Sequence, residues 1–218
     1  GTLIAVVAFF TTDIVKLVAA APGALTGRDG EWERMGRMIV VGTIPVVIVG
    51  GLFADAIEEQ LRSPAMIAVT MTIGAIGLVI AERLGRKTRD AQSLGYGEAF
   101  AIGCAQALAL APGISRSGST LTLSLLINLE RASAARFIFL MSLPAIVAAA
   151  AKEALELSKV GTEGLPVTIL AVGLVTSAAV GYLTVRFFIR YLADHSLEVF
   201  AYYRFALAAA TVVWLLSR

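Results

Sequence analysis

The chain has 218 residues, of which 58% are hydrophobic and only 16% are charged, and its mean hydropathy is +0.83. This composition is too apolar for an ordinary soluble domain. The formal net charge of +2 gives no reason to expect a nucleic-acid partner. A single cysteine excludes an internal disulfide, and a single histidine excludes a histidine-rich metal cluster within this chain.

Long apolar stretches predict an all-α, polytopic membrane protein that forms one integral-membrane domain over residues 1–218. A helix needs about 20 mostly apolar residues to cross the hydrocarbon core of a bilayer. Six stretches reach that length, which predicts six spans. They are 2–21, 36–55, 64–82, 134–152, 166–187 and 198–217.

One further apolar stretch, residues 97–129, is interrupted by Pro112-Gly113 and by Gly118. The two halves are too short to cross a bilayer as helices. We therefore predict a re-entrant helical hairpin between the third and fourth spans.

Basic residues in the connecting segments predict the orientation, because short loops rich in Lys and Arg remain in the cytoplasm. The loops at 56–63 and 153–165 carry more Glu than basic residues and are predicted to be external. Two full spans and one hairpin would give the same charge pattern, but the short halves favour re-entry. The residues predicted to be cytoplasmic are Arg28, Arg34, Arg37, Arg83, Arg86, Lys87, Arg89, Arg131, Arg136, Arg186 and Arg190.

The interruption at 112–120 places an arginine, Arg116, among glycines and hydroxyl side chains. An arginine near the membrane centre costs about 2.5–3.5 kcal/mol on insertion scales, so it is normally held by an anion, a carboxylate or a watery cavity. The second half-helix should begin near Ser117, which aims its free N–H groups and positive dipole end at the same place. This combination predicts a phosphate-binding loop. The alternative is a simple kink, with small residues for helix packing and Arg116 extended to the membrane surface.

The segment 103–120, Gly-Cys-Ala-Gln-Ala-Leu-Ala-Leu-Ala-Pro-Gly-Ile-Ser-Arg-Ser-Gly-Ser-Thr, resembles the undecaprenyl-diphosphate phosphatase family. These integral-membrane enzymes are also called bacitracin-resistance proteins. Shorter stretches at 1–3, 42–45, 137–144 and 200–204 support the resemblance, which thus extends over nearly the whole chain.

The resemblance implies hydrolysis of undecaprenyl diphosphate to undecaprenyl phosphate and inorganic phosphate, with a divalent cation, Mg or Ca, assisting. It implies an external-facing site in the bacterial inner membrane, with a polyprenyl diphosphate lipid and the bilayer as partners. Arg116 would clamp the diphosphate and Ser115, Ser117 and Thr120 would line the pocket. The remaining implied substrate-binding residues are Gly113, Gly118, Ser119 and the weaker candidate Gln106.

One departure from the family concerns catalysis. The family has an earlier re-entrant half, with a Glu-x-x-x-Glu segment and a Pro-x-Ser-Ser-Ser-Gly-His stretch, which this chain lacks. General acid–base chemistry would need that carboxylate and imidazole. His195 is not expected to replace it, because the charge pattern places it in a cytoplasmic loop. We therefore expect that residues before Gly1 are missing and that the isolated chain binds diphosphate weakly and hydrolyses it poorly.

Other charged residues have structural interpretations. Asp13 and Lys16 share a helical face and are expected to neutralise each other. Glu98 is expected to cap the first half-helix. Arg204 is expected to pair with Asp13 or, alternatively, to meet a substrate headgroup. Cys104 is expected to pack within an apolar half-helix.

Two other functions were considered. Acid-phosphatase-like membrane lipid phosphatases need a histidine six residues beyond the arginine, where this chain has Thr122, so that class is excluded. A transporter or flippase for an anionic substrate remains open, because broken helices and midplane anion sites also occur in transporters.

Overall fold

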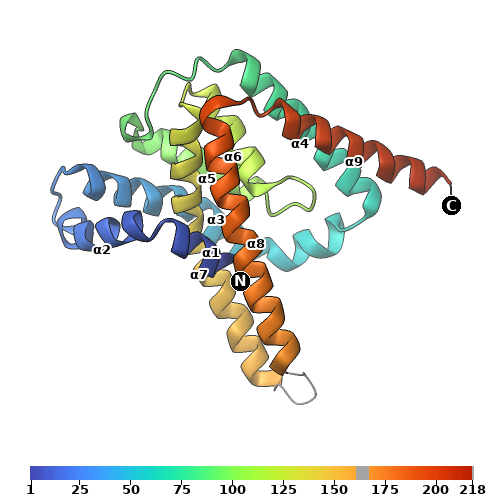
Figure 1. The fold of residues 1–218 in the computed structure, drawn as a ribbon, viewed down its shortest axis with the longest axis horizontal. Coiled ribbons are helices and arrows are strands. Elements are labelled where there is room, and N and C mark those ends of the chain that lie inside the picture. The colour runs from blue at the N-terminus through green and yellow to red at the C-terminus, as the bar shows by residue number, and fades with distance from the viewer. Residues whose placement is uncertain (161–166, 218) are drawn as a thin grey trace.

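The computed structural model describes residues 1–160 and 167–217, which form α-helices joined by short loops (Figure 1). The described ranges contain no β-strand, which confirms the predicted all-α class. The helices are α1 (Thr2–Phe9), α2 (Thr11–Leu25), α3 (Glu31–Leu61), α4 (Pro64–Leu84), the 3₁₀ turn η1 (Ala91–Ser93), α5 (Tyr96–Leu108), α6 (Arg116–Leu126), α7 (Arg131–Val160), α8 (Val167–Asp194) and α9 (Glu198–Leu216).

Within the described residues, five helices are long and apolar enough to cross a membrane, or six if the bent pair α1 and α2 forms one span. This confirms a polytopic membrane protein. α3 and α7 are longer than the predicted spans. In particular, α7 continues to Val160, into the loop predicted at 153–165. Residues 161–165 of that loop lie outside the described ranges.

The predicted straight span at 2–21 is instead two helices, because α1 and α2 meet at Phe10 with a bend of 79°. The hydroxyl of Thr11 donates to the backbone oxygens of Val7 and Ala8, at 2.8 and 3.0 Å. Hydroxyls bonded back to the preceding turn bend helices. The ring of Phe10 is buried at the bend and packs into the core.

Helices α5 and α6 form a hairpin. The start of α5 and the end of α6 lie together at its base, where both contact Arg89. The backbone of Arg89 pairs with that of the segment 128–130, directly after α6. Its guanidinium also donates to Glu98 in the first turn of α5 and to the backbone oxygen of Ile127. With 13 residues, α5 is about 20 Å long, which is less than the roughly 30 Å of a hydrocarbon core.

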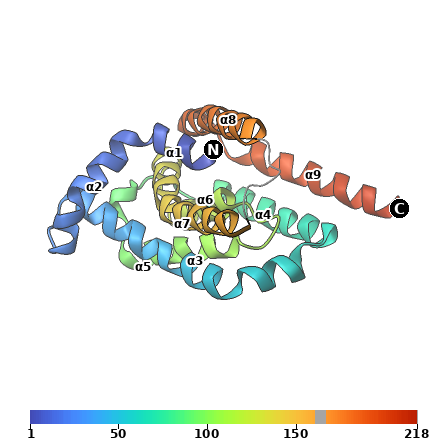
Figure 2. The same ribbon diagram turned by 90° about the horizontal axis from the view of Figure 1, so that it is seen from below.

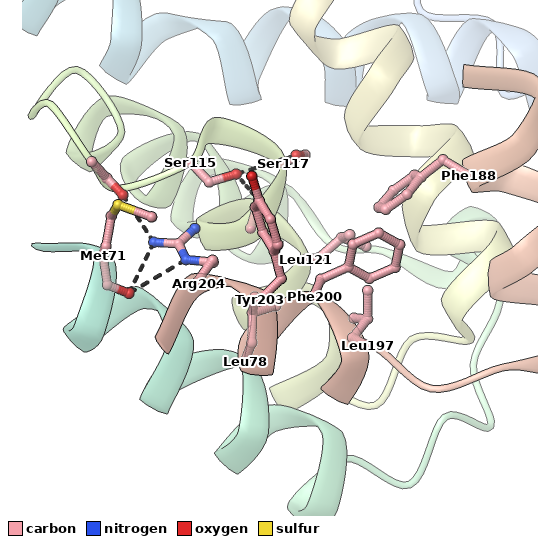
Figure 3. Close-up of a pocket in the computed structure, with 12 residues that line it drawn as sticks. Met71, Leu78, Ser115, Ser117, Leu121, Phe188, Leu197, Phe200, Tyr203 and Arg204 are labelled. Atoms are coloured by element: carbon pink, nitrogen blue, oxygen red, sulfur yellow. Dashed lines mark hydrogen bonds between the residues drawn. The ribbon is translucent and has the colours of Figure 1, made fainter. Parts of the chain in front are cut away.

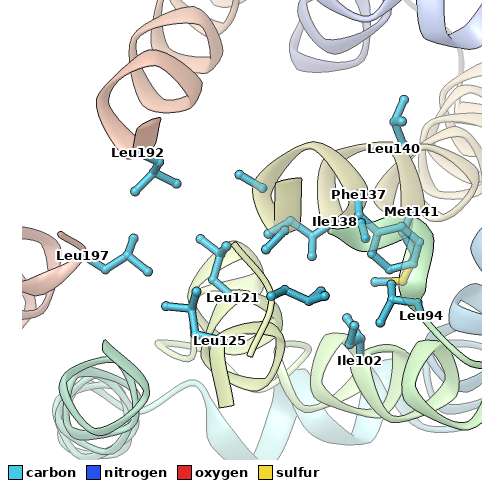
Figure 4. Packing of buried hydrophobic residues seen from close by; sticks show 14 of the residues in the cluster. Leu94, Ile102, Leu121, Leu125, Phe137, Ile138, Leu140, Met141, Leu192 and Leu197 are labelled. Atoms are coloured by element: carbon cyan, nitrogen blue, oxygen red, sulfur yellow. The ribbon is translucent and has the colours of Figure 1, made fainter. Parts of the chain in front are cut away.

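The two helices of the hairpin pack against each other, and α5 also packs against α3, while α6 packs against α4 and α7. Figure 2 shows α6 and α7 near the centre, with α1, α2, α3, α4, α8 and α9 around them. Side chains from α5, α6 and α7 meet in one apolar core, which also receives residues from the α8–α9 corner (Figure 4). The labelled core residues are Leu94, Ile102, Leu121, Leu125, Phe137, Ile138, Leu140, Met141, Leu192 and Leu197.

The outer faces of the spans are apolar and exposed, as expected of helices solvated by lipid. α8 is the extreme case, since only 6% of its most apolar stretch is buried. Cys104 also lies on an outer face, of α5. It does lie in the apolar half-helix, as expected, but the buried face of α5 is formed by its neighbours Ala99, Ile102 and Gly103.

The expected Asp13–Lys16 pair does not form. Asp13 is buried and accepts two hydrogen bonds from Arg136 of α7, while the Lys16 ammonium lies 5.0 Å from the ring centre of Trp32. Arg136 reaches the carboxylate across 123 residues of sequence, a contact that local spacing does not reveal. Glu98 accepts a hydrogen bond from the Gly95 N–H at 2.9 Å, so its expected capping role is confirmed.

Candidate functional site

A cavity of about 390 Å³ lies between the hairpin loop and helices α4, α8 and α9 (Figure 3). Its polar end is formed by the loop before α6 and its first turn, together with one arginine from α9. Its other end is formed by apolar and aromatic side chains. The lining residues are Met71, Leu78, Gly113, Ser115, Ser117, Gly118, Leu121, Phe188, Leu197, Phe200, Tyr203 and Arg204.

The loop between α5 and α6 is held against the first turns of α4. The Thr70 hydroxyl donates to the backbone oxygen of Pro112 at 2.6 Å. Gly113 has φ +93°, a conformation that favours glycine, and a Cβ added there would overlap Thr70 and lie 2.8 Å from the backbone oxygen of Ile67. Only glycine therefore lets the loop approach α4 this closely.

Ser115 is the N-cap of α6. Its Oγ accepts a hydrogen bond from the Gly118 N–H at 3.2 Å and lies 3.5 Å from the Ser117 Oγ. In the described part of the chain, the N–H groups of Arg116 and Ser117 have no acceptor. Two free N–H groups, two hydroxyls and the positive end of the helix dipole thus converge, which is an arrangement that favours an anion.

Arg204 enters the cavity from α9, although it is only 8% exposed. Its guanidinium donates to the backbone oxygen of Gly113 at 2.9 Å and to that of Met71 at 3.3 and 3.4 Å. It lies between two glycines, since a Cβ on Gly74 would overlap it and one on Gly118 would lie 3.1 Å from its Nη1. The expected pairing of Arg204 with Asp13 was wrong, because Asp13 pairs with Arg136.

Among the described residues no carboxylate contacts Arg204, so its charge is compensated only by carbonyl dipoles. A cation left in this state inside a membrane protein points to an anionic ligand. In the sequence analysis, contact of Arg204 with a substrate was only the alternative to pairing with Asp13. The signal that could have favoured a functional role is that Arg204 is a single arginine within an otherwise apolar span.

Arg116 is the first residue of α6 and is exposed beside the cavity rather than among the residues that line it. Its guanidinium has no hydrogen-bond or ion-pair partner in the described part of the chain. The side chain is therefore available to reach a ligand that extends out of the polar end of the cavity.

Of the eight candidate residues, Gly113, Ser115, Ser117 and Gly118 line the cavity, and three others lie away from it. Thr120 is buried and its hydroxyl donates to the backbone oxygen of Arg116 at 2.8 Å. Ser119 donates to the backbone oxygen of Ala105 at 2.8 Å and so joins α6 to α5. Gln106 is 1% exposed, and its amide has no partner within the described residues.

The lining of the cavity contains an arginine and hydroxyls but no Asp, Glu or His. In the ranges the structure describes, no group of three or more His, Cys, Asp or Glu side chains is arranged to hold a metal ion. The donor set on this side of the site therefore fits an anion and does not fit a resident divalent cation.

Comparison with known proteins gives one consistent result. Residues 1–210 match the family described as bacitracin resistance protein BacA. The chain is 45% identical over 222 residues to an undecaprenyl-diphosphatase from Rubrobacter xylanophilus, in an alignment that covers 99% of this chain and 80% of that protein. It is also 42% identical to the undecaprenyl-diphosphatases of Moorella thermoacetica and Chlorobium luteolum, with the same shares of each chain covered.

Proposed function

This chain belongs to the bacitracin resistance protein BacA family, and we propose that it is a membrane phosphatase that hydrolyses undecaprenyl diphosphate to undecaprenyl phosphate and inorganic phosphate. The reaction would recycle the lipid carrier of cell-wall synthesis. Relatives named undecaprenyl-diphosphatase cover nearly the whole chain.

The observation that carries this proposal is the polar end of the cavity. Arg204, a buried arginine that no carboxylate of the described residues contacts, lies beside the first turn of α6. The N–H groups of Arg116 and Ser117 in that turn have no acceptor in the same part of the chain, and the hydroxyls of Ser115 and Ser117 lie next to them. A diphosphate supplies the negative charge and the acceptor oxygens that these donors lack. An arginine fork also matches two phosphate oxygens at once.

In the proposed reaction, water attacks the terminal phosphorus and the bond from that phosphorus to the bridging oxygen breaks. Undecaprenyl phosphate leaves with the bridging oxygen, and the oxygen and protons of the water end on inorganic phosphate. Negative charge grows on the bridging oxygen and on the transferred group. Arg204, Arg116 and the α6 N-terminus would stabilise that charge, and such preorganised donors supply a large share of catalysis in phosphoryl transfer. Ser115 and Ser117 would orient the phosphate oxygens.

A divalent cation is implied by the resemblance to the family, but the side chains that line the cavity within the described residues do not fit one. The side chains that line the cavity are cationic, hydroxylic or apolar. We therefore assign the diphosphate oxygens to Arg204, Arg116 and the α6 N–H groups.

We further propose a location in the bacterial plasma membrane with the cavity facing outward. Contacts between the basic segments support this orientation, because Arg83 pairs with Glu198, Arg131 with Glu82 and Arg89 with Glu98. The basic segments thus lie at one end, the cytoplasmic end by the charge rule. The loop tip contacts Thr70, near the opposite end of α4.

The test is phosphate release from a long-chain prenyl diphosphate by the full-length protein, purified in detergent. We expect Arg116→Ala to lower kcat/KM by about 100-fold or more, since removing one preorganised donor costs this much in other enzymes. The matched control is Arg190→Ala, an exposed arginine of α8 that does not line the cavity. Binding of the lipid without phosphate release would instead support a transporter, and equal rates in both variants would contradict the proposed site.

A further inference from the structure

The two ends of the cavity differ in chemistry. Beyond Gly113, Ser115, Ser117 and Arg204, the lining contains no polar side chain except the hydroxyl of Tyr203. The apolar end is closed by Leu78, Leu121 and Leu197, each at most 2% exposed. A diphosphate at the polar end therefore leaves an apolar volume next to it that the phosphate groups do not fill.

The cavity extends along the lengths of α4 and α9. Met71 and Leu78 of α4 both line it and are seven residues apart, which is about 10 Å along a helix. On α9, Arg204 and Leu197 have the same separation. The volume thus runs from the guanidinium of Arg204 toward the α8–α9 corner, and it is long enough for several carbons of a chain attached to the diphosphate.

One wall of this end is aromatic and comes from two helices. The rings of Phe188 in α8 and Phe200 in α9 meet edge to face, with 5.1 Å between their centres. Phe139 supports Phe188 at 6.0 Å, and Tyr191 supports Phe200 at 5.6 Å. Figure 3 shows Phe188 and Phe200 on the side of the cavity away from Arg204.

We place the entrance on the side of α8 and α9, where the lining side chains are exposed. Tyr203 is 66% exposed and Phe188 and Phe200 are partly exposed, in contrast to the buried leucines at the closed end. From their shared corner, α8 and α9 diverge, as Figure 1 shows. Because the outer faces of both helices are apolar, the entrance faces the part of the surroundings where a lipid chain resides.

We infer that the apolar end binds the isoprene units nearest the diphosphate, and that Phe188 and Phe200 determine selectivity for prenyl diphosphates over diphosphates with shorter organic groups. This inference rests on the proposed function and assigns the second half of the same substrate. The lipid enters between α8 and α9, its diphosphate meets Arg204 and the α6 N-terminus, and its first isoprene units lie against the aromatic wall.

The test compares dimethylallyl, geranyl and farnesyl diphosphate, which carry progressively longer prenyl chains, with the protein encoded by the complete gene. For the unmodified protein, kcat/KM should rise with chain length. In Phe188→Ala, kcat/KM for farnesyl diphosphate should fall by roughly tenfold, through KM, while that for dimethylallyl diphosphate changes little. The matched control is Phe187→Ala, since Phe187 is the adjacent ring on α8, is 60% exposed and does not line the cavity.

A second measurement uses the unmodified protein and so does not depend on a variant folding. A farnesyl diphosphate analogue with a photoreactive group at the end of its chain should label peptides that contain residues 185–203. Labels confined to α1, α2 or α3 would overturn the inference.

The outcomes separate the two proposals. The inference is wrong, although the protein is a phosphatase, if all three diphosphates react at the same rate. It is also wrong if Phe187→Ala and Phe188→Ala lose the same selectivity, because the aromatic wall then does not determine the preference for prenyl chain length. If no diphosphate releases phosphate and photolabelling still maps to α8 and α9, the chain site stands and the proposed phosphatase function fails.

Discussion

Two residues of the loop between α5 and α6 have backbone conformations that side chains usually disfavour. Gly113 has φ +93° and Ser115 has φ +20°. A non-glycine residue in such a conformation costs on the order of 1–3 kcal/mol, and it persists only where the surroundings fix it. Here the Ser115 Oγ caps the Gly118 N–H, and the strained residue is also the one that presents its hydroxyl to the cavity.

Gly113→Ala should destabilise the protein by roughly 2–5 kcal/mol, from the left-handed conformation and the overlap of the new methyl group with Thr70 and Ile67. The measurement is thermal or denaturant unfolding in detergent, together with phosphate release. Gly97→Ala is the control, because a Cβ at Gly97 meets no atom within 4 Å. Equal stability of the two variants would show that the loop does not need its close approach to α4.

At the scale of elements, the hairpin depends on its base. Arg89 contacts both of its helical ends, through Glu98 at the start of α5 and the Ile127 backbone oxygen at the end of α6. The hydrogen bonds that Arg89 donates to Glu98 lower the pKa of the Glu98 carboxyl and raise the pKa of the Arg89 guanidinium. Arg89 and Glu98 lie outside the five candidate spans, and their side chains are 34% and 31% exposed, so protons have access to the pair.

The sign of the resulting pH dependence follows from the depressed pKa of Glu98. Its contribution to stability is complete above the pKa of an unfolded glutamate, about 4.3, and is lost as the pH falls through the lower folded pKa. We therefore expect the unfolding temperature of the wild type to drop more steeply than that of Glu98→Gln when the pH is lowered from 5 toward about 3. Parallel curves for the two proteins would contradict a stabilising role for the ionised pair.

At the scale of the whole molecule, Glu82 connects helices that are distant in sequence. This buried carboxylate of α4 accepts hydrogen bonds from Arg131 of α7 and from the Leu197 N–H before α9, and it pairs with Lys87 at 3.2 Å. Leu197 also closes the apolar end of the cavity. The corner that positions α9, and with it Arg204, is thus fixed by one charge.

Glu82→Gln should cost roughly 3 kcal/mol of stability, because it leaves Arg131 and Lys87 without their counter-charge in a partly buried network. The control is Glu198→Gln, which breaks the more exposed pair with Arg83 and should cost less than about 1 kcal/mol. Unfolding in detergent measures both. Similar losses for the two variants would show that Glu82 is no more than a surface partner.

The sequence predicted most of the fold, because spans depend on local length and hydropathy. The break between α5 and α6 also followed from local signals, the proline and glycines that interrupt 97–129, whereas the re-entry of this hairpin into the membrane stays a prediction. The bend at Phe10 did not, since no proline or glycine marks it. At the site, the loop residues were predictable from their spacing, whereas the approach of Arg204 depends on the packing of α9 on α4. No local pattern encodes a contact across 91 residues.

The way in which Arg204 is held determines which substitutions its neighbours tolerate. Its anchors are main-chain oxygens of Met71 and Gly113, which every substitution at those positions retains. Gly74 and Gly118 border the guanidinium, and a side chain at either position would crowd it. In a library of random variants selected for growth, many residues should therefore be accepted at Met71, while Gly74 and Gly118 should be retained. In a background where Arg204 is replaced by a shorter side chain, residues other than glycine should also be accepted at Gly74.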